Sequence, residues 1–398
     1  MTKKVSTPAI RFKGFTDTWE QRKLGDIADI VGGGTPSTEN QSYWNGDIDW
    51  YAPAEIADQI YANSSQKKIT GLGYENSSAK MLPPGTVLFT SRAGIGKTAI
   101  LTRKGCTNQG FQSIVPHRGE LDSYFIFSRT EELKRYGELV GAGSTFVEVS
   151  GKQMAVMELM MPPTMREQQT IGGFFQQLDN LITLHQRKYD KLTNVKKSML
   201  EKMFPKNGSN VPEIRFKGFT DAWKQRKFEE IAVRSSVICS DANLPRVEYE
   251  DIVSGAGRLN KDIYAKQSSK SGIAFHRGDV LYGKLRPYLQ NWLLPTFDGI
   301  AVGDFWVLQP QNADSSFLYR LIQSRQFDEV ANQSTGTKMP RADWKLVSKT
   351  VFSIPSNISE QAAIGTYFTA LDNLITLHQR KLEKLKNLKK ACLEKMFV

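Results

Sequence analysis

The 398-residue sequence predicts an α+β fold: two mixed α/β bodies joined by two long antiparallel helices that form a coiled-coil spacer, with a pseudo-twofold internal repeat. Two observations predict this fold. First, residues 10–17 (IRFKGFTD) return letter for letter at 214–221, and residues 178–188 (LDNLITLHQRK) return at 371–381. Second, the segments between these copies differ greatly. A frame used twice around two different bodies is typical of a protein that binds two different things, and it is of little use to a single-pocket enzyme.

The spacing of the copies shows how the two halves correspond. Position 10 matches 214, an offset of 204, whereas position 178 matches 371, an offset of 193. The smaller offset already holds at Gly85 (GTVLF) against Gly278 (GDVLY). The second body is therefore 11 residues shorter before Gly85, and the two bodies are expected to share one fold.

Four segments follow from this division. We place the first body with its leading frame segment at 1–163, the first spacer helix at 164–206, the second body with its leading segment at 207–356, and the second spacer helix at 357–398. In the first body, 87–90, 98–102 and 111–115 are rich in strand-forming residues and bounded by turn residues, so each is expected to be a strand. Residues 123–140 are expected to form one helix, and 317–330 its counterpart.

The end of each half carries the strongest helix pattern. Thr164 with Glu167, and Asn357 with Glu360, are spaced as capping boxes. Apolar residues then recur every three or four positions, and such helices need a partner to bury the stripe. About 28 residues at 1.5 Å each span roughly 42 Å, close to one turn of B-DNA at about 34–36 Å. The residues expected to pair the helices or to bind a partner are Leu178, Leu181, His185, Leu192, Val195, Met199, Leu371, Leu374, His378, Leu385 and Leu388.

Composition excludes several classes of protein. No run of 18 apolar residues is present, so no membrane span or membrane partner is expected. Cys106, Cys239 and Cys392 lie far apart, which fits a reducing cytoplasm and disfavours a disulfide or zinc framework. The four histidines have no metal-ligand spacing, and no metal site is expected.

The net charge of +12 lies in the repeated frame. Segments 1–28, 168–206, 207–232 and 361–398 carry +3, +4, +1 and +4, whereas 29–167 and 233–360 carry −2 and +2. A basic frame favours a polyanion or an acidic partner surface, although a solvated lysine-rich helix face would look the same.

No catalytic site stands out. Residues 92–98 (RAGIGKT) follow a predicted strand and end like a phosphate-binding loop, but Ser91 occupies the place of its first glycine. Asp47 and Asp49 alternate on a predicted strand and are expected at the surface. Gly32–Gly34 are expected to form a turn. We therefore expect no catalytic residue, and an NTPase using Gly94–Thr98 remains only a less favoured alternative.

Polar residues at the strand ends of both bodies suit contacts to nucleic acid. Arg and Lys match guanine edges and phosphates, and Asn and Gln match adenine. For any one of them ordinary surface polarity is an equal explanation, but as a set on matching loops they favour DNA. The candidates are Ser91, Arg92, Lys97, Arg103, Lys104, Asn108, Gln109, Gln112, Ser144, Thr145, Lys284, Arg286, Tyr288, Gln290, Asn291, Lys338 and Arg341.

The order of several segments resembles the specificity subunit of type I restriction–modification systems. They are 19–28 (WEQRKLGDIA) before 34–36 (GTP), 278–288 (GDVLYGKLRPY), 143–146 (GSTF), 161–163 (MPP) before 167–168 (EQ), and 178–182 (LDNLI). The resemblance spans nearly the whole chain, and the repetition of the order makes it specific.

The resemblance implies two target-recognition domains, each reading one half of a split, asymmetric double-stranded DNA sequence. It implies that the frame docks two modification (methyltransferase) subunits, which restriction (translocase and endonuclease) subunits join. It implies no catalytic residue and no cofactor on this chain, with S-adenosylmethionine, ATP and Mg²⁺ on the partner subunits. A scaffold whose two bodies bind proteins is the alternative from another class.

Overall fold

The computed structural model describes residues 7–56, 59–92, 94–142, 148–206, 209–265, 268–333 and 339–397. It divides into two compact units, one formed by residues 1–185 with 381–398 and the other by 186–380. Each unit holds one body and a part of both long helices. The repeat, the two mixed bodies and the two long helices are confirmed.

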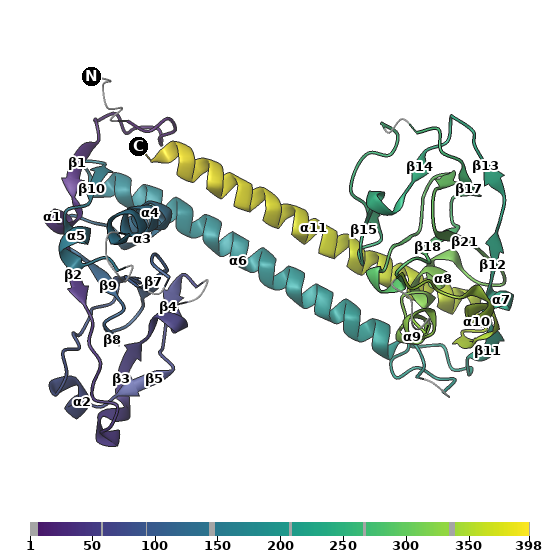
Figure 1. Cartoon of the computed structure of the whole chain (residues 1–398), viewed down its shortest axis with the longest axis horizontal. Coiled ribbons are helices and arrows are strands. Elements are labelled where there is room, and N and C mark those ends of the chain that lie inside the picture. Colours follow the sequence, from purple (N-terminus) through teal and green to yellow (C-terminus); the bar gives the residue numbers. More distant parts are fainter. Residues whose placement is uncertain are drawn as a thin grey trace. The chain divides into compact units, whose positions relative to one another are not determined.

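The first body is built on three sheets (Figure 1). A five-stranded sheet has the order β2-β9-β6-β7-β4, a three-stranded sheet the order β5-β3-β8, and β1 pairs with β10. Strands β6, β7 and β9 confirm the three strands predicted from sequence. The bounds are β1 Glu20–Lys23, β2 Ala28–Gly32, β3 Trp44–Tyr51, β4 Tyr61–Ala62, β5 Lys67–Ile69, β6 Val87–Phe89, β7 Thr98–Leu101, β8 Cys106–Thr107, β9 Gln112–Pro116 and β10 Glu158–Met161.

The expected single helix over 123–140 is wrong, because two helices meet at Arg129. The Arg129 guanidinium is buried and donates to the Met160 carbonyl oxygen at 2.7 Å and to the Glu132 carboxylate. This tertiary contact outweighs the local helix pattern. The helices of the first body are α1 Leu24–Ile27, α2 Gly71–Glu75, α3 Ser123–Ser128, α4 Thr130–Gly141 and α5 Gly151–Ala155, with 3-10 turns at Gln41–Tyr43 and Pro53–Glu55.

The second body repeats this plan with a different outer part. Its sheets have the orders β12-β21-β18-β19, β13-β17-β20-β14, β11-β22 and β15-β16. The strands are β11 Lys224–Lys227, β12 Ala232–Ser235, β13 Ile238–Cys239, β14 Arg246–Val247, β15 Ile252–Val253, β16 Arg258–Leu259, β17 Gly272–Phe275, β18 Val280–Gly283, β19 Trp292–Leu293, β20 Gly299–Ala301, β21 Phe305–Pro310 and β22 Val351–Ile354. The helices are α7 Phe228–Ile231, α8 Ser315–Leu321, α9 Arg325–Ala331 and α10 Trp344–Lys349, with 3-10 turns at Tyr249–Asp251 and Pro287–Leu289.

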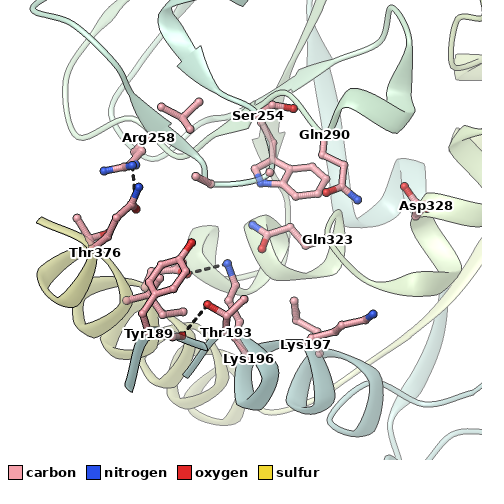
Figure 2. Close-up of a pocket in the computed structure, with 18 of the residues that line it drawn as sticks. Tyr189, Thr193, Lys196, Lys197, Ser254, Arg258, Gln290, Gln323, Asp328 and Thr376 are labelled. Atoms are coloured by element: carbon pink, nitrogen blue, oxygen red, sulfur yellow. Dashed lines mark hydrogen bonds and ion pairs between the residues drawn. The ribbon is translucent and has the colours of Figure 1, made fainter. Parts of the chain in front are cut away.

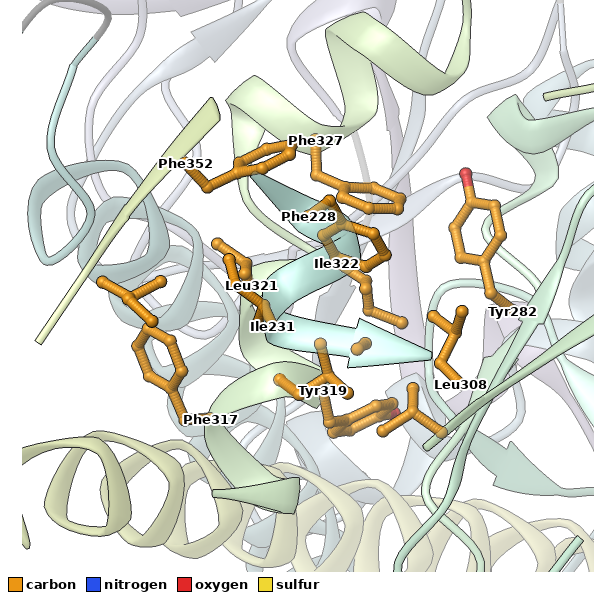
Figure 3. Close-up of a cluster of buried hydrophobic side chains, with 14 of the residues drawn as sticks. Phe228, Ile231, Tyr282, Leu308, Phe317, Tyr319, Leu321, Ile322, Phe327 and Phe352 are labelled. Carbon is orange, nitrogen blue, oxygen red and sulfur yellow. The ribbon is translucent and has the colours of Figure 1, made fainter. Parts of the chain in front are cut away.

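The helix expected over 317–330 is likewise two helices. Ser324 is the N-cap of α9, because its side chain accepts a hydrogen bond from the Phe327 amide. A new helix therefore begins after Ser324. Behind these helices lies a core of aromatic and aliphatic side chains in which Phe228, Phe327 and Phe352 pack together (Figure 3). The outer β13-β17-β20-β14 sheet has its own smaller core around Phe275 and Phe305.

Six strands therefore correspond between the bodies, namely β2-β9-β6-β7 with β12-β21-β18-β19 and the pair β1-β10 with β11-β22. The outer sheets do not correspond. The first body adds three mixed strands, β5-β3-β8, where the second adds four, β13-β17-β20-β14. The expected common fold is confirmed for the inner sheet.

The long helices α6 (Met165–Lys202, 38 residues) and α11 (Ile358–Met396, 39 residues) run antiparallel within each unit. In the first unit the beginning of α6 packs against the end of α11, and Asp179 forms an ion pair with Lys389 at 2.6 Å. In the second unit the end of α6 packs against the beginning of α11, and Lys196 forms an ion pair with Asp372 at 2.7 Å.

The predicted helix stripe divides into buried and exposed positions. Leu178 and Leu371 are buried, and Leu192, Val195, Met199 and Leu385 pack against the cores. His185 and His378 are half-buried. By contrast, Leu181, Leu374 and Leu388 are 43%, 44% and 47% exposed.

Candidate nucleic-acid interface

An identical clamp joins each body to its long helix. In the first unit the Glu167 carboxylate accepts two hydrogen bonds from the Arg11 guanidinium, at 2.6 and 2.7 Å, and one from the Trp19 indole at 3.2 Å. Glu167 is 1% exposed, and the interaction raises the pKa of Arg11. The clamp therefore fixes the leading frame segment against the start of α6.

The second unit holds the same clamp, in which Glu360 accepts from Arg215 at 2.6 and 2.8 Å and from Trp223 at 3.2 Å. The capping-box prediction is only half right for both helices. Thr164 still caps the Glu167 amide at 3.4 Å, and Asn357 caps the Ser359 amide at 2.8 Å. The Glu167 and Glu360 carboxylates, however, bind the arginine and the tryptophan of the clamp and not the capping residue's backbone. Sequence reasoning missed Arg11 and Arg215, although both lie within the identical repeat.

In the first body, loops after β2 and before β9 bring polar side chains together. The Gly34 amide donates to the Thr107 carbonyl oxygen at 2.9 Å, and Thr35 donates to the Gln109 amide oxygen at 2.5 Å. A Cβ at Gly33 would lie 2.1 Å from the Asn108 carbonyl oxygen, so only glycine permits this approach. The predicted turn at 32–34 thus lies against the loop of the exposed Gln109, and Thr35 orients the Gln109 side chain. Nothing in the sequence indicated that these two segments meet.

A second cluster in the first body centres on Asp49. Arg103 binds the Asp49 carboxylate at 2.5 Å and remains half exposed. Asp49 is 3% exposed, so the expectation that it lies at the surface is wrong. Burial alone raises its pKa, but hydrogen bonds from Ser65 and the charges of Arg103 and Lys68 lower the pKa below its usual value. A buried carboxylate therefore orients an exposed guanidinium, while Asp47 and the candidate Lys104 are exposed.

The loop that resembles a phosphate-binding loop cannot cradle phosphates in this conformation. The amides of Gly96 and Lys97 donate to the Thr90 carbonyl and hydroxyl oxygens, at 3.0 and 2.9 Å. Ile95 is 7% exposed and turns toward α4. Two of the loop amides are therefore already used, whereas the Lys97 side chain is exposed.

In the second body, the candidates gather around Asp304. Its carboxylate binds Arg341 at 2.9 Å and Lys284 at 3.5 Å. Burial alone raises its pKa, but the hydrogen bonds and charges of Arg341 and Lys284 lower the pKa below its usual value. Tyr249 donates to the Asp304 carbonyl oxygen at 2.6 Å and accepts from the Leu285 amide at 3.0 Å, which ties both strand ends to this point.

Burial separates the remaining candidates. Ser91 is 0% and Asn291 8% exposed, so neither side chain can reach a base edge in this conformation. Arg92, Asn108, Gln112 and Gln290 are half-buried, and Arg286 and Tyr288 are exposed. Ser144, Thr145 and Lys338 lie outside the described residues.

A cavity of about 740 Å³ lies in the second unit between the body and the long helices. Figure 2 shows Gln290 and Ser254 on one side of it and Lys196, Thr193 and Tyr189 on the other. Arg258 donates to Gln379 at 3.0 Å at its edge. The first unit has a corresponding cavity of about 680 Å³, lined by Asp179, Ile182 and Thr183 where the second has Asp372, Ile375 and Thr376.

Two other kinds of site have no support in the described part of the chain. Within it, no group of three or more His, Cys, Asp or Glu side chains is placed to hold a metal ion. No described helix is both long and apolar enough to span a bilayer.

The comparisons agree with this architecture. The type I restriction enzyme MjaIX specificity subunit of Methanocaldococcus jannaschii is 26% identical to this chain, covering 95% of it and 92% of that protein. The MjaVIII specificity subunit of the same organism is 22% identical, covering 94% of this chain and 91% of that protein. The solved S subunit of a type-I restriction-modification system from M. genitalium shares the fold, with a TM-score of 0.66 at 13% identity, and the match covers 98% of this chain and 99% of that one.

The sequence model described as "Type I restriction modification DNA specificity domain" matches this chain twice, at residues 16–194 and 248–387. The two matches cover most of the chain and one falls on each half. The chain belongs to the family of type I restriction–modification specificity proteins.

Proposed function

We propose that this chain is the sequence-specific DNA recognition subunit of a type I restriction–modification complex. Each body reads one half of a split, asymmetric target, and the chain itself performs no catalysis. The methyl donor, ATP and Mg²⁺ are bound by its partner subunits.

The observation that carries this proposal is the contrast between a duplicated frame and different readers. The Glu167 and Glu360 clamps agree in partners and in distances to within 0.1 Å (2.6, 2.7 and 3.2 Å against 2.6, 2.8 and 3.2 Å). The outer sheets of the two bodies differ in strand number and order. A duplicated frame that carries two different DNA-binding bodies suits the recognition of an asymmetric, two-part DNA sequence.

Exposed leucines on the frame support two equivalent partner sites. Leu181 and Leu184 in the first unit are 43% and 46% exposed, and their counterparts Leu374 and Leu377 in the second are 44% and 45% exposed. Apolar side chains exposed at equivalent positions of both units suit contacts with two copies of one partner protein. We assign each pair to one modification subunit.

Methylation mapping tests the recognition function. The chain is expressed with its modification subunit in a methylation-free host, and modified adenines are located across the genome. The expected result is one split motif, and replacing residues 207–356 with the second body of another family member should change one half of that motif only. A body exchange that alters protein partners while leaving the methylated motif intact would instead establish the scaffold alternative.

Native mass spectrometry tests the partner sites. Leu181→Asp with Leu184→Asp should lower the number of modification subunits bound per chain from two to one. Leu139→Asp is the matched control, since Leu139 is 77% exposed on α4 and lies outside the frame. An unchanged stoichiometry in the frame variant would refute this assignment.

A further inference from the structure

The loop after β18 in the second body has a strained backbone. Arg286 and Gln290 have φ angles of 49° and 56°, in the left-handed region, and they flank the 3-10 turn Pro287–Leu289. Residues other than glycine adopt this region at a cost in free energy. Such strain persists only where the surrounding structure enforces it, and it is concentrated at functional sites.

Four hydrogen bonds to three other segments of the second body enforce it here. The Arg286 amide donates to the Pro340 carbonyl oxygen at 2.7 Å, and the Leu285 amide to the Tyr249 hydroxyl at 3.0 Å. The Gly255 amide donates to the Gln290 carbonyl oxygen at 3.1 Å, and the Ser254 hydroxyl to that of Leu289. The loop is therefore held rigidly at both ends.

The tip of this rigid loop is apolar and faces solvent. Tyr288 is 56% and Leu289 37% exposed. Leu285 forms an isolated antiparallel bridge with Arg341, and Met339, two residues before Arg341, is 49% exposed. Three large apolar side chains on this loop or near the strand end bridged to it are thus exposed, although burying them would stabilise the free protein.

Three cations lie on this loop or at the strand ends next to it. Arg286 is exposed within it, and no acidic side chain of the described residues forms an ion pair with Arg286. Lys284 and Arg341 flank it, held by Asp304. An apolar tip next to cations complements DNA, whose bases stack inside a phosphate backbone.

In the first body the residue that corresponds to Tyr288 is buried. The offset of 193 carries Tyr288 to Ile95, which is 7% exposed and packs toward Gly137 of α4. There the positive φ angles belong to Gly94 and Gly96, at 104° and 94°. The exposed apolar tip therefore belongs to the second body and not to the shared frame.

We propose that Tyr288 and Leu289, with Met339 beside them, form a wedge that enters the base stack of the half-site read by the second body. Apolar side chains inserted between base steps unstack and kink the duplex. Rigidity matters because a flexible tip would lose conformational entropy on insertion. This inference rests on the proposed function, and it predicts an unstacked step, separate from the base that the methyltransferase flips, in only one of the two half-sites.

The test uses the complex of this chain with its modification subunits and a duplex bearing the mapped target. 2-Aminopurine, whose fluorescence rises when it unstacks, is placed at each step of both half-sites in turn. Because methyltransferases flip their target base out of the duplex, a rise at the methylated adenine is expected in both half-sites. The wedge predicts one further rise, at a different step and in the second half-site only. Tyr288→Ala with Leu289→Ala should abolish this further rise, leave the rise at the methylated adenines, and weaken binding roughly 5- to 150-fold, the range for losing a base–aromatic stack.

Two controls separate stacking from other effects. Tyr288→Phe should keep both the fluorescence rise and the affinity, because a stacked ring does not need its hydroxyl group. Tyr264→Ala removes a tyrosine that is 68% exposed and packs on Phe297 in the same body, and it should change neither.

The outcomes are distinguishable. Specific binding with fluorescence rises only at the methylated adenines overturns the wedge and leaves the recognition function standing. The wedge is also overturned if the Tyr288 and Leu289 double variant weakens binding no more than Tyr264→Ala does. If the complex methylates no split target at all, the recognition function fails and the wedge fails with it.

Discussion

The Asp372 carboxylate and the Lys196 ammonium group lie 2.7 Å apart in the second unit, and Asp179 and Lys389 form the same pair at 2.6 Å in the first. The offset of 193 relates the two pairs: Asp179 and Lys196 lie on α6, and their counterparts Asp372 and Lys389 lie on α11. Each helix therefore contributes the aspartate of one pair and the lysine of the other. The surroundings differ, however. Asp372 also binds Arg320 at 2.7 Å, whereas Asp179 accepts a hydrogen bond from the Tyr124 hydroxyl at 2.9 Å.

This difference predicts unequal effects of removing the two lysines. Lys389→Met leaves a buried Asp179 with a neutral donor, and we expect it to lower the free energy of unfolding by about 3 kcal/mol. Lys196→Met leaves Asp372 paired with Arg320, and we expect a loss of about 1 kcal/mol or less. Urea denaturation of both variants measures the difference, and equal losses would contradict the assigned surroundings.

The Glu167 and Glu360 clamps predict that glutamine is a poor replacement. In a capping box Gln serves as well as Glu, so Glu167→Gln would be nearly neutral if capping were its role. Because each carboxylate binds an arginine while 1% exposed, we expect Glu167→Gln and Glu360→Gln each to cost about 3 kcal/mol. Urea denaturation measures both, and losses below about 1 kcal/mol would support the capping role instead.

Asp304 predicts an acid-dependent stability of the second unit. Its folded pKa lies below the usual 3.8, so the ionised form stabilises the fold, fully at neutral pH. That contribution disappears as the pH falls from about 4 through the lowered folded pKa. Between pH 5 and pH 3 the melting temperature of the native chain should therefore fall further than that of Asp304→Asn. Asp47→Asn, at an exposed position, should follow the native chain, and parallel curves for the native chain and Asp304→Asn would refute the prediction.

The loop at 94–98 predicts no nucleotide binding. The Gly96 and Lys97 amides already donate to Thr90, so they have no hydrogen to offer a phosphate. Isothermal titration of the chain with Mg·ATP should give no heat of binding, and Lys97→Ala should behave identically. Binding that disappears in Lys97→Ala would revive the NTPase alternative.

The charge distribution predicts weak DNA binding by the chain alone. Segments 29–167 and 233–360 carry only −2 and +2, so phosphate attraction must come from the basic frame and from the partner subunits. Fluorescence anisotropy with the mapped target should show far weaker binding by the chain than by the assembled complex, with a smaller dependence on salt. Equal affinities would show that the bodies suffice.

The repeat allowed most of the architecture to be predicted. Identical frame segments and a constant offset of 193 after Gly85 gave two bodies of one fold and two equivalent helices. Hydrophobic periodicity located the long helices because it reports on burial along a single element. The inner strands β6, β7 and β9 followed from local composition for the same reason.

Contacts between distant segments limited what could be predicted of the site. The break at Arg129 depends on the Met160 carbonyl oxygen, 31 residues away, and local propensity favoured a continuous helix. Asp49 alternates like a surface residue, yet it is buried against Ser65, Lys68 and Arg103. Ser91 and Asn291 looked like loop tips because sequence does not show which side of a loop faces the core.

By itself, the sequence determined that one frame is built twice around two different bodies, and that the net charge lies in the frame. Only the tertiary structure decided which polar groups face solvent and which hold the bodies in place. Glu167 is the clearest case, since its spacing from Thr164 matches a capping box while its carboxylate binds Arg11, 156 residues away. The physical reason is that a local pattern fixes the backbone, whereas a buried charge binds whichever partner the fold brings to it.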